Sequence, residues 1–269
     1  MEHSQRGSFP PDRRIALLID ADNIAHGKIG PMLSELSKYG VANIRRAYGD
    51  WTNPALKGWE GKLHEFAIRP IQQFNYSKGK NATDIALVID AMELLYTQKL
   101  DGFCIASSDG DFTPLVMQLR ANGHDVYGFG ERKTPDPFVN ACTTFLFLDS
   151  LGQEPEPEPV NEAKKKPTLK DKDAAPAKPV VPKKLSQDAK LVSLLRGAVE
   201  ATAGDNGWAL LSTVGSAVKR QAPIDPRNYG VKNFIKLFEA TELFEIVKPK
   251  GSSHSWVADR RNKDRAPTP

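Results

Sequence analysis

The sequence has little cysteine, no long apolar run and no apolar segment at its start. The two cysteines among its 269 residues, Cys104 and Cys142, lie in apolar stretches, which is typical of small buried side chains rather than of disulfides or a metal site. No stretch approaches the roughly 18 uninterrupted apolar residues of a membrane span, and residues 1–14 are polar. We therefore expect a soluble protein of a reducing compartment, the cytoplasm, with no membrane partner.

Several signatures of enzyme classes are also missing. The five histidines show no paired spacing typical of metal ligands, and no Ser-His-Asp arrangement can be argued from the sequence. There is no Walker loop, and Gly128-Phe129-Gly130 lacks the third glycine of a dinucleotide fingerprint. These absences argue against an ATPase and against a nicotinamide-dependent dehydrogenase.

What is present indicates two folded domains joined by a linker. Hydrophobic residues make up 40% of the chain and charged residues 26%, as in ordinary globular proteins. Residues 152–188 contain seven prolines and no aromatic residue, so this segment cannot bury a core and is predicted to be a disordered, extended linker. The predicted domains are therefore residues 13–150 and 189–259.

The two halves differ in charge. Residues 1–151 carry a net charge of −2, whereas residues 189–258 carry +3 and the tail from Asp259 carries +2. A basic C-terminal half is a modest indication of a polyanionic partner, because positive surfaces attract phosphates over several ångströms.

The N-terminal half alternates apolar runs with amphipathic segments. The runs typical of strands are residues 15–19, 41–48, 68–74, 103–106, 126–129 and 145–148. The segments typical of helices are residues 31–39, 54–66, 82–96 and 112–122. Because strands buried on both faces form continuous apolar runs, this alternation predicts a three-layer α/β/α domain with a mostly parallel sheet.

The C-terminal half is too small for such a sheet. Apolar periodicity predicts helices around residues 191–199, 210–218 and 228–240, the last with Asp225 as its N-cap and Pro226 at its first position. Residues 243–247 and 255–257 flank a turn rich in lysine, glycine and serine, which predicts a hairpin. Three helices and a hairpin favour a small α+β fold resembling a winged helix.

Carboxylates follow two of the predicted strands and begin one helix. Asp20 ends the first strand, Asp109 and Asp111 follow the strand at 103–106, and Asp84 lies in the first turn of the helix at 82–96. In open α/β sheets ligands gather beyond the carboxyl ends of the strands. Each residue could instead simply cap the next helix, but capping does not explain why acidic residues recur at both strand ends.

A divalent cation is the simplest way to hold such a group of like charges together. Carboxylate oxygens suit Mg²⁺ or Mn²⁺, and such an ion activates phosphoryl oxygens and bound water. We therefore expect Asp20, Asp84, Asp109 and Asp111 to be both metal ligands and catalytic residues. The expected supporting residues are Asn23, Lys80, Asp90 and Ser108. For Asp90 a role in capping a neighbouring loop is equally compatible with the sequence, and for Lys80 that of an ordinary solvated lysine.

Three blocks of the N-terminal half carry a family resemblance. IALLIDADNI, GKNATDIALVIDAMELLY and GFCIASSDGDFTPLVMQLRANGHDVYGFG occur in that order and together resemble the NYN domain of the PIN-like nuclease superfamily, close to the LabA-like bacterial group. The resemblance covers about residues 13–150. It implies metal-dependent cleavage of RNA, with Asp20, Asp84, Asp109 and Asp111 in the acidic site and Asn23 matching the Asn that follows the first Asp.

The C-terminal half resembles a LOTUS domain, also called OST-HTH. GWALLSTVGSAVKR, IDPRNYGVKNFIKLFEA and LFEIVKPKGSSHSWVA carry this likeness, which implies binding of RNA, single-stranded or structured, or of a protein partner. The expected phosphate contacts in this half are Lys219, Arg220, Arg227, Lys232, Lys236, Lys248 and Lys250. In the N-terminal half, basic residues accompanied by tryptophans could guide a strand toward the acidic site: Arg45, Arg46 and Lys78.

The leading hypothesis is therefore a metal-dependent ribonuclease whose second domain recruits RNA. One alternative is a regulatory adaptor that binds RNA without cutting it. A haloacid-dehalogenase-like phosphatase is a weaker alternative, because that family places a Thr two residues after its second Asp and this chain has Ile24 there.

Overall fold

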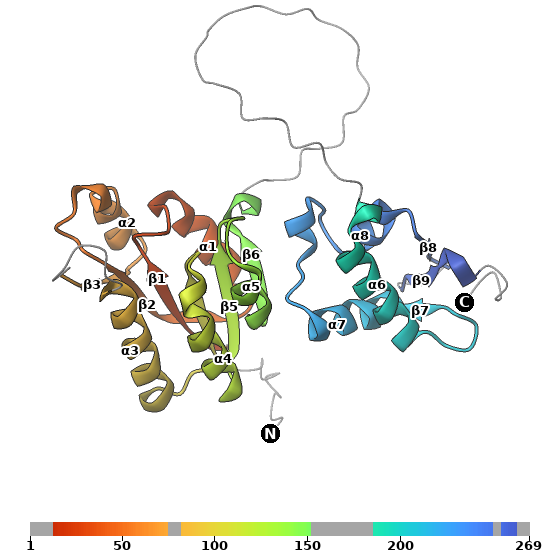
Figure 1. Cartoon of the computed structure of the whole chain (residues 1–269), viewed down its shortest axis with the longest axis horizontal. Coiled ribbons are helices and arrows are strands. Elements are labelled where there is room, and N and C mark those ends of the chain that lie inside the picture. The colour runs from red at the N-terminus through yellow and green to blue at the C-terminus, as the bar shows by residue number, and fades with distance from the viewer. Residues whose placement is uncertain (1–12, 75–81, 152–184, 250–253, 263–269) are drawn as a thin grey trace, which may run out of the picture. The chain divides into compact units, whose positions relative to one another are not determined.

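The computed structural model describes residues 13–74, 82–151, 185–249 and 254–262. The chain divides into two compact units (Figure 1), and the N-terminal and C-terminal elements are described here separately. Within the described ranges, no helix has the length and apolar character required to cross a membrane.

The N-terminal elements form a six-stranded parallel sheet with helices on both faces (Figure 1). Its strands are β1 (Arg14–Asp20), β2 (Val41–Gly49), β3 (Arg69–Gln72), β4 (Gly102–Ala106), β5 (Asp125–Gly130) and β6 (Thr144–Phe147). The helices are α1 (Ile29–Leu36), α2 (Trp59–Glu65), α3 (Ala82–Thr97), α4 (Thr113–Ala121) and α5 (Asp136–Ala141). The predicted α/β/α class is confirmed.

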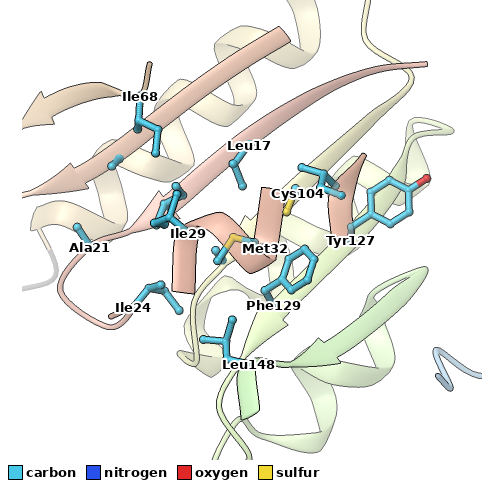
Figure 2. Packing of buried hydrophobic residues seen from close by; sticks show 14 of the residues in the cluster. Leu17, Ala21, Ile24, Ile29, Met32, Ile68, Cys104, Tyr127, Phe129 and Leu148 are labelled. Atoms are coloured by element: carbon cyan, nitrogen blue, oxygen red, sulfur yellow. The ribbon is translucent and has the colours of Figure 1, made fainter. Parts of the chain in front are cut away.

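The central strand β1 shows why the sheet is buried on both faces. Ile15, Leu17 and Ile19 pack into one hydrophobic cluster (Figure 2), whereas Ala16 and Leu18 pack into another. Side chains of a strand alternate between the two faces, so a continuous apolar run supplies both cores. All five residues are at most 1% exposed.

The helices divide between the two faces according to these clusters. Met32 of α1 and Trp59 of α2 belong to the cluster of Figure 2. Leu87 of α3, Leu115 of α4 and Phe138 of α5 belong to the opposite one. The short helix α5 was not predicted; it begins directly after Pro135 and spans only 6 residues, too few to show a helical period.

The order of the strands fixes where a ligand would bind. It runs β3-β2-β1-β4-β5-β6, so the chain builds outward from β1 in one direction and then crosses to β4 and continues in the other. In doubly wound sheets this reversal opens a crevice at the carboxyl ends of the two central strands. The ends of β1 and β4 are therefore the expected place for a functional site.

The C-terminal elements comprise helices and a small antiparallel sheet. They are α6 (Ala189–Thr202), β7 (Ala209–Leu210), α7 (Leu211–Gln221), α8 (Phe234–Thr241), β8 (Phe244–Val247) and β9 (Trp256–Asp259), with the sheet order β7-β9-β8. The antiparallel pairing of β8 with β9 confirms the predicted hairpin, and the whole is consistent with a winged helix.

The third predicted helix of this half is divided in two. A 3-10 turn covers Pro226–Tyr229, with Asp225 as its N-cap as predicted, and it ends at Gly230 with φ +75°. Helix α8 then begins after Asn233, whose side chain accepts a 3.0 Å hydrogen bond from Lys236 N. A left-handed glycine ends one helical segment and a capping asparagine opens the next, which is why the predicted single helix at 228–240 was wrong.

Candidate active site

Asp20 lies at the carboxyl end of β1 and is fully buried. Its Oδ2 accepts hydrogen bonds of 2.7 Å from Ser107 Oγ and of 2.7 Å from Asn23 Nδ2, while Oδ1 accepts a longer one of 3.3 Å from Asn23 N. A carboxylate offers about four lone pairs, so Oδ1 keeps capacity for a further ligand. Burial raises the pKa of Asp20, and the bonds from Ser107 and Asn23 oppose that rise.

Asp109 and its neighbours follow the adjacent strand β4. Asp109 Oδ1 accepts a 2.9 Å bond from Asp111 N, and Asp109 N donates to Ser107 Oγ at 3.1 Å. Ser108 Oγ accepts a 2.8 Å bond from Glu131 N, which ties this loop to the end of β5. Asp109 therefore caps the 3-10 turn Gly110–Phe112, and its charge also belongs to the acidic group.

Asp84 is half-buried in the first turn of α3. Burial, and then the charges of four other aspartates, raise its pKa to about 6. In order of effect these are Asp20, Asp109, Asp22 and Asp111. The predicted catalytic carboxylates therefore act on one another electrostatically, although they come from β1, β4 and α3.

The donor chemistry of this group fits a hard divalent cation. Five aspartates, Asp84 and the four whose charges raise its pKa, belong to this group, which includes the ends of the paired strands β1 and β4. Oxygen ligands suit Mg²⁺ and Mn²⁺. Among the residues that the structure describes, however, no three His, Cys, Asp or Glu side chains stand close enough to form a finished metal site. The carboxylates of the described residues are thus neighbours, but no three of them stand in the arrangement of metal ligands.

Asp90 lies on α3 in a separate polar network. Its carboxylate pairs with the guanidinium of Arg46 and accepts a hydrogen bond from Tyr48 Oη. Burial and the Asp90 carboxylate raise the pKa of Tyr48 well above its usual value. Asp90 and Arg46 thus tie α3 to β2.

The other basic residue predicted on β2 is also engaged within the protein. Arg45 Nε donates to the carbonyl of Ala42 at 3.1 Å and Nη1 to that of Phe66 at 2.9 Å. Lys78 and Lys80 lie outside the described residues. Of the three basic residues predicted to guide a strand toward the acidic group, the described two, Arg45 and Arg46, are bound to other groups of the protein.

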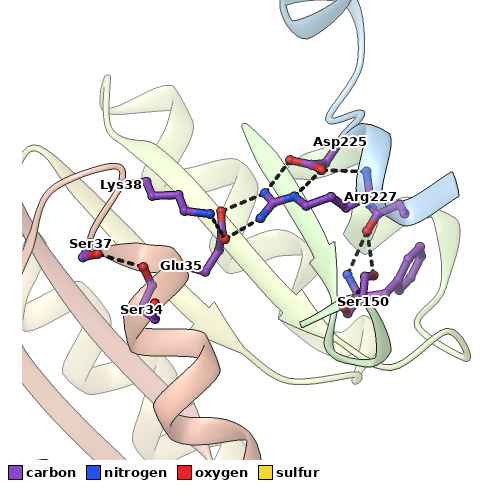
Figure 3. A network of polar contacts seen from close by, with 9 residues as sticks. Ser34, Glu35, Ser37, Lys38, Ser150, Asp225 and Arg227 are labelled. Carbon is purple, nitrogen blue, oxygen red and sulfur yellow. Dashed lines mark hydrogen bonds and ion pairs between the residues drawn. The ribbon is translucent and has the colours of Figure 1, made fainter. Parts of the chain in front are cut away.

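Two of the basic residues predicted in the C-terminal half lie beside carboxylates. The guanidinium of Arg227 is bound to Asp225, with Nε–Oδ1 and Nη2–Oδ2 distances of 2.8 Å each (Figure 3), and Lys236 Nζ lies 3.0 Å from Glu239 Oε2. Lys236 is nevertheless exposed, and so are Lys219, Arg220, Lys232 and Lys248. Lys250 lies outside the described residues.

Comparison with known families agrees with this architecture. Residues 14–149, just over half of the chain, match the family model of the NYN domain, and residues 184–255 match that of the OST-HTH/LOTUS domain. The chain belongs to the NYN family. The NYN domain precedes the LOTUS domain, as predicted, and the pair supports an RNA-related nuclease or binding role.

Individual relatives add little on function. An uncharacterized protein of Methanocaldococcus jannaschii is 28% identical over 124 residues, which is 44% of this chain and 48% of the relative, so the chain spans about half of that protein. A protein of unknown function from Vibrio parahaemolyticus is 17% identical at a TM-score of 0.44, over 52% of this chain and 95% of that one. An uncharacterized protein from Nitrosomonas europaea is 25% identical at a TM-score of 0.25, covering 34% and 92%.

Three residues in or next to the acidic group were not among the expected site residues. Ser107 binds Asp20, Asp22 adds its charge to the group, and Thr83 forms a side-chain hydrogen bond with Asp22. The Asp-x-Asp pattern at 20–22, repeated at 109–111, is visible in the sequence, but Asp22 was left out of the expected metal ligands. Ser107 and Thr83 carry no comparable signal, because their role depends on which strand and helix become neighbours.

Proposed function

We propose that the chain is a metal-dependent ribonuclease in which the acidic group of the NYN domain hydrolyses RNA phosphodiesters. The observation that carries this proposal is the convergence of Asp20, Asp84 and Asp109 at the reversal point of the sheet. Structural carboxylates are normally paired with bases, but the pKa of Asp84 is raised first by burial and then by the charges of four further acids. Such an arrangement costs stability and is typical of a site that uses its charges.

The residues that would hold a Mg²⁺ or Mn²⁺ ion are Asp20, Asp84, Asp109 and Asp111. When bound, such an ion polarises a phosphoryl oxygen and activates water for attack on phosphorus. The protein contributes the orientation of the ligands. Asn23 and Ser107 fix the Asp20 carboxylate through Oδ2 and leave Oδ1 the less engaged oxygen, while Asp109 is fixed by its own capping bond.

The LOTUS domain would recruit the substrate. Its exposed Arg220, Lys232 and Lys248 can contact phosphates without reading sequence. Because both domains belong to one chain, RNA held by the LOTUS domain is present at the NYN site at a raised local concentration. Weak binding by the second domain would therefore suffice to increase cleavage.

One observation favours a second candidate function, an adaptor that binds RNA without cutting it. Within the described part of the chain the carboxylates do not form a closed set of three metal ligands. A metal-dependent enzyme requires its ligands to be held to within about half an ångström of the productive geometry. The adaptor therefore predicts tight RNA binding and intact RNA in the presence of any divalent metal.

A time course on end-labelled single-stranded RNA and DNA separates these functions. The full chain is incubated with Mg²⁺, Mn²⁺ or EDTA and compared with Asp109→Asn and with Glu93→Gln, which changes an exposed carboxylate of α3. The nuclease predicts metal-dependent products that disappear in Asp109→Asn and persist in Glu93→Gln. Intact RNA in every reaction, together with RNA binding on a gel, would support the adaptor instead.

A further inference from the structure

A cavity of about 740 Å³ lies beside the acidic group without being part of it. It is bounded by the ends of β2 and β3 and by α2, and its walls include Trp51, Leu56, Lys57, Leu63, His64 and Gln72. This volume is within the range of sites that bury small organic ligands. No residue of the acidic group lines it.

Trp51 is held in a fixed orientation in this cavity. Its Nε1 donates a 3.0 Å hydrogen bond to the carbonyl of Ile71, and its backbone N donates to Gln72 Oε1 at 3.0 Å. Its ring contacts the buried Trp59 edge-on, with centroids 6.2 Å apart and planes at 72°. The Trp51 side chain remains partly exposed, so a planar ligand can stack on it with little loss of side-chain entropy.

The chemistry of the walls favours a nucleobase over a lone phosphate. Leu56, Leu63 and Ile68 form an apolar surface, which gives an anion no compensation for losing water. Among the wall residues, Lys57 supplies a positive charge and Glu60 a negative one, and both are exposed. A nucleotide matches these walls, because its flat neutral base can contact the apolar surface while its phosphate stays near the exposed charges.

The cavity and the acidic group lie at the same edge of the sheet. All six strands are parallel, so Gly49 at the end of β2 is on the same edge as Asp20. A Cβ atom placed on Gly49 would lie 2.8 Å from Leu56 Cδ1 and 3.8 Å from Asp22 Oδ1. Leu56 of the cavity wall and Asp22 of the acidic group therefore both lie close to Gly49.

We propose that this cavity receives one unpaired nucleobase of an RNA strand, stacked on Trp51, while a neighbouring phosphodiester lies at the acidic group. The RNA strand is taken from the proposed function, and the base-binding role of the cavity is the added inference. A base can enter only when it is free of its duplex partner. The cavity thus selects single-stranded or looped RNA and sets the position of the cut relative to the captured base.

Abasic substrates test this without altering the protein. Single-stranded RNAs that each lack one base, at successive positions around the cleaved bond, are cut by the full chain in Mn²⁺. One position is expected to show a loss of cleavage efficiency of about 5- to 150-fold, the value of one base stacked on an aromatic ring. Equal cleavage of all abasic RNAs would overturn the base-binding role while leaving the ribonuclease intact.

A double-mutant cycle then assigns the loss to Trp51. Trp51→Ala is expected to reduce cleavage of intact RNA by the same factor and to add no further loss on the sensitive abasic RNA, because both changes remove one interaction. Trp51→Phe, which keeps a ring, is expected to retain most of the cleavage. The control is Tyr96→Ala, which removes an aromatic side chain that is 71% exposed on α3 and should change nothing. Independent losses from Trp51→Ala and from base removal would overturn the assignment.

Failure of the ribonuclease proposal would not leave the cavity untested. If the wild-type chain cuts no RNA, binding of a fluorescein-labelled single-stranded hexanucleotide is measured in EDTA by anisotropy. The cavity predicts weaker binding by Trp51→Ala than by Trp51→Phe or Tyr96→Ala, and weaker binding of an abasic hexanucleotide. Identical affinities throughout would overturn it.

Discussion

Ser107 Oγ donates a 2.7 Å hydrogen bond to Asp20 Oδ2, joining the end of β4 to the end of β1 across the reversal point of the sheet. The same oxygen of Ser107 accepts a 3.1 Å bond from Asp109 N. One hydroxyl therefore holds the carboxylate of Asp20 and the backbone of Asp109, which follow neighbouring strands. Ser107 and Asp20 are both buried, so bulk water cannot replace the bond between them.

Removing this hydroxyl is expected to impair both cleavage and stability. Ser107→Ala should reduce metal-dependent RNA cleavage by about 10- to 100-fold, as for other residues that orient a metal ligand. It should lower the free energy of unfolding by about 1–3 kcal/mol, since Asp20 and Asp109 N each lose a bond. Cleavage rates and urea unfolding measure the two effects.

The control is Ser37→Ala, which removes an exposed hydroxyl bonded to the Ser34 carbonyl (Figure 3). An unchanged cleavage rate in Ser107→Ala would show that the bond from Ser107 to Asp20 has no positioning role.

Asp84 is expected to destabilise the metal-free protein at neutral pH. Its pKa is about 6 in the folded state against 3.8 ordinarily, so between those values the folded state binds more protons than the unfolded state. Stability contributed by this group is therefore lost as pH rises from about 4 to 6. Asp84→Asn should remove that dependence and raise the free energy of unfolding at pH 7 by about 1 kcal/mol, after allowance for solvent screening of a half-buried group.

Urea unfolding in EDTA between pH 4 and 7.5 measures this effect. Glu93→Gln on the same helix is the matched control, because Glu93 is exposed. Parallel stability curves for wild-type protein and Asp84→Asn across this pH range would contradict the electrostatic account of the acidic group.

Asp90 is expected to act on stability rather than on the acidic group. Asp90→Ala leaves the guanidinium of Arg46 and the hydroxyl of Tyr48 without their shared partner. The free energy of unfolding should fall by about 3 kcal/mol, since the Arg46 and Asp90 side chains are only 21% and 15% exposed. Denaturant unfolding measures the loss, and cleavage at a temperature where the variant is folded should stay within a few-fold of wild type. A stable but inactive Asp90→Ala would instead favour the supporting role at the acidic site that the sequence predicts for Asp90.

The exposed basic residues of the LOTUS domain are expected to bind phosphates. Arg220→Gln with Lys232→Gln should weaken RNA binding and reduce the slope of log K against log salt by about 0.7 for each lost contact with a single strand. Cleavage at saturating RNA should be unchanged, because the NYN site is untouched. Anisotropy titrations at several salt concentrations measure the slope, and an unchanged slope would exclude these two residues from the RNA contact.

Much of the fold was predictable because its signals are local. The apolar run at 15–19 alternates between two cores, which requires a sheet covered on both faces. The division of the third C-terminal helix was not predictable from periodicity. Apolar residues continue across Gly230 and Asn233, whereas the helical backbone conformation is interrupted there. Local conformation at single residues decided that boundary.

The grouping of the carboxylates was predictable from the sequence, but their hydrogen-bond contacts were not. Parallel strands bring their carboxyl ends to one edge, so Asp20 and Asp109 could be grouped from the sequence. That β1 lies next to β4, and hence that Ser107 reaches Asp20, depends on strand order. The hydrogen bonds of Arg45 to the Phe66 carbonyl and of Arg46 to Asp90 likewise depend on which elements become neighbours in the fold.

The central claim is that the acidic group cuts RNA, and single-turnover cleavage by Asp20→Asn tests it most directly. Enzyme in excess over one labelled single-stranded RNA is followed in Mn²⁺, with wild type and Glu93→Gln beside it. The account predicts that Asp20→Asn binds the RNA as wild type does but cleaves it at least about 100-fold more slowly, whereas Glu93→Gln cleaves normally. Cleavage by Asp20→Asn at the wild-type rate, or cleavage that persists in EDTA, would contradict it.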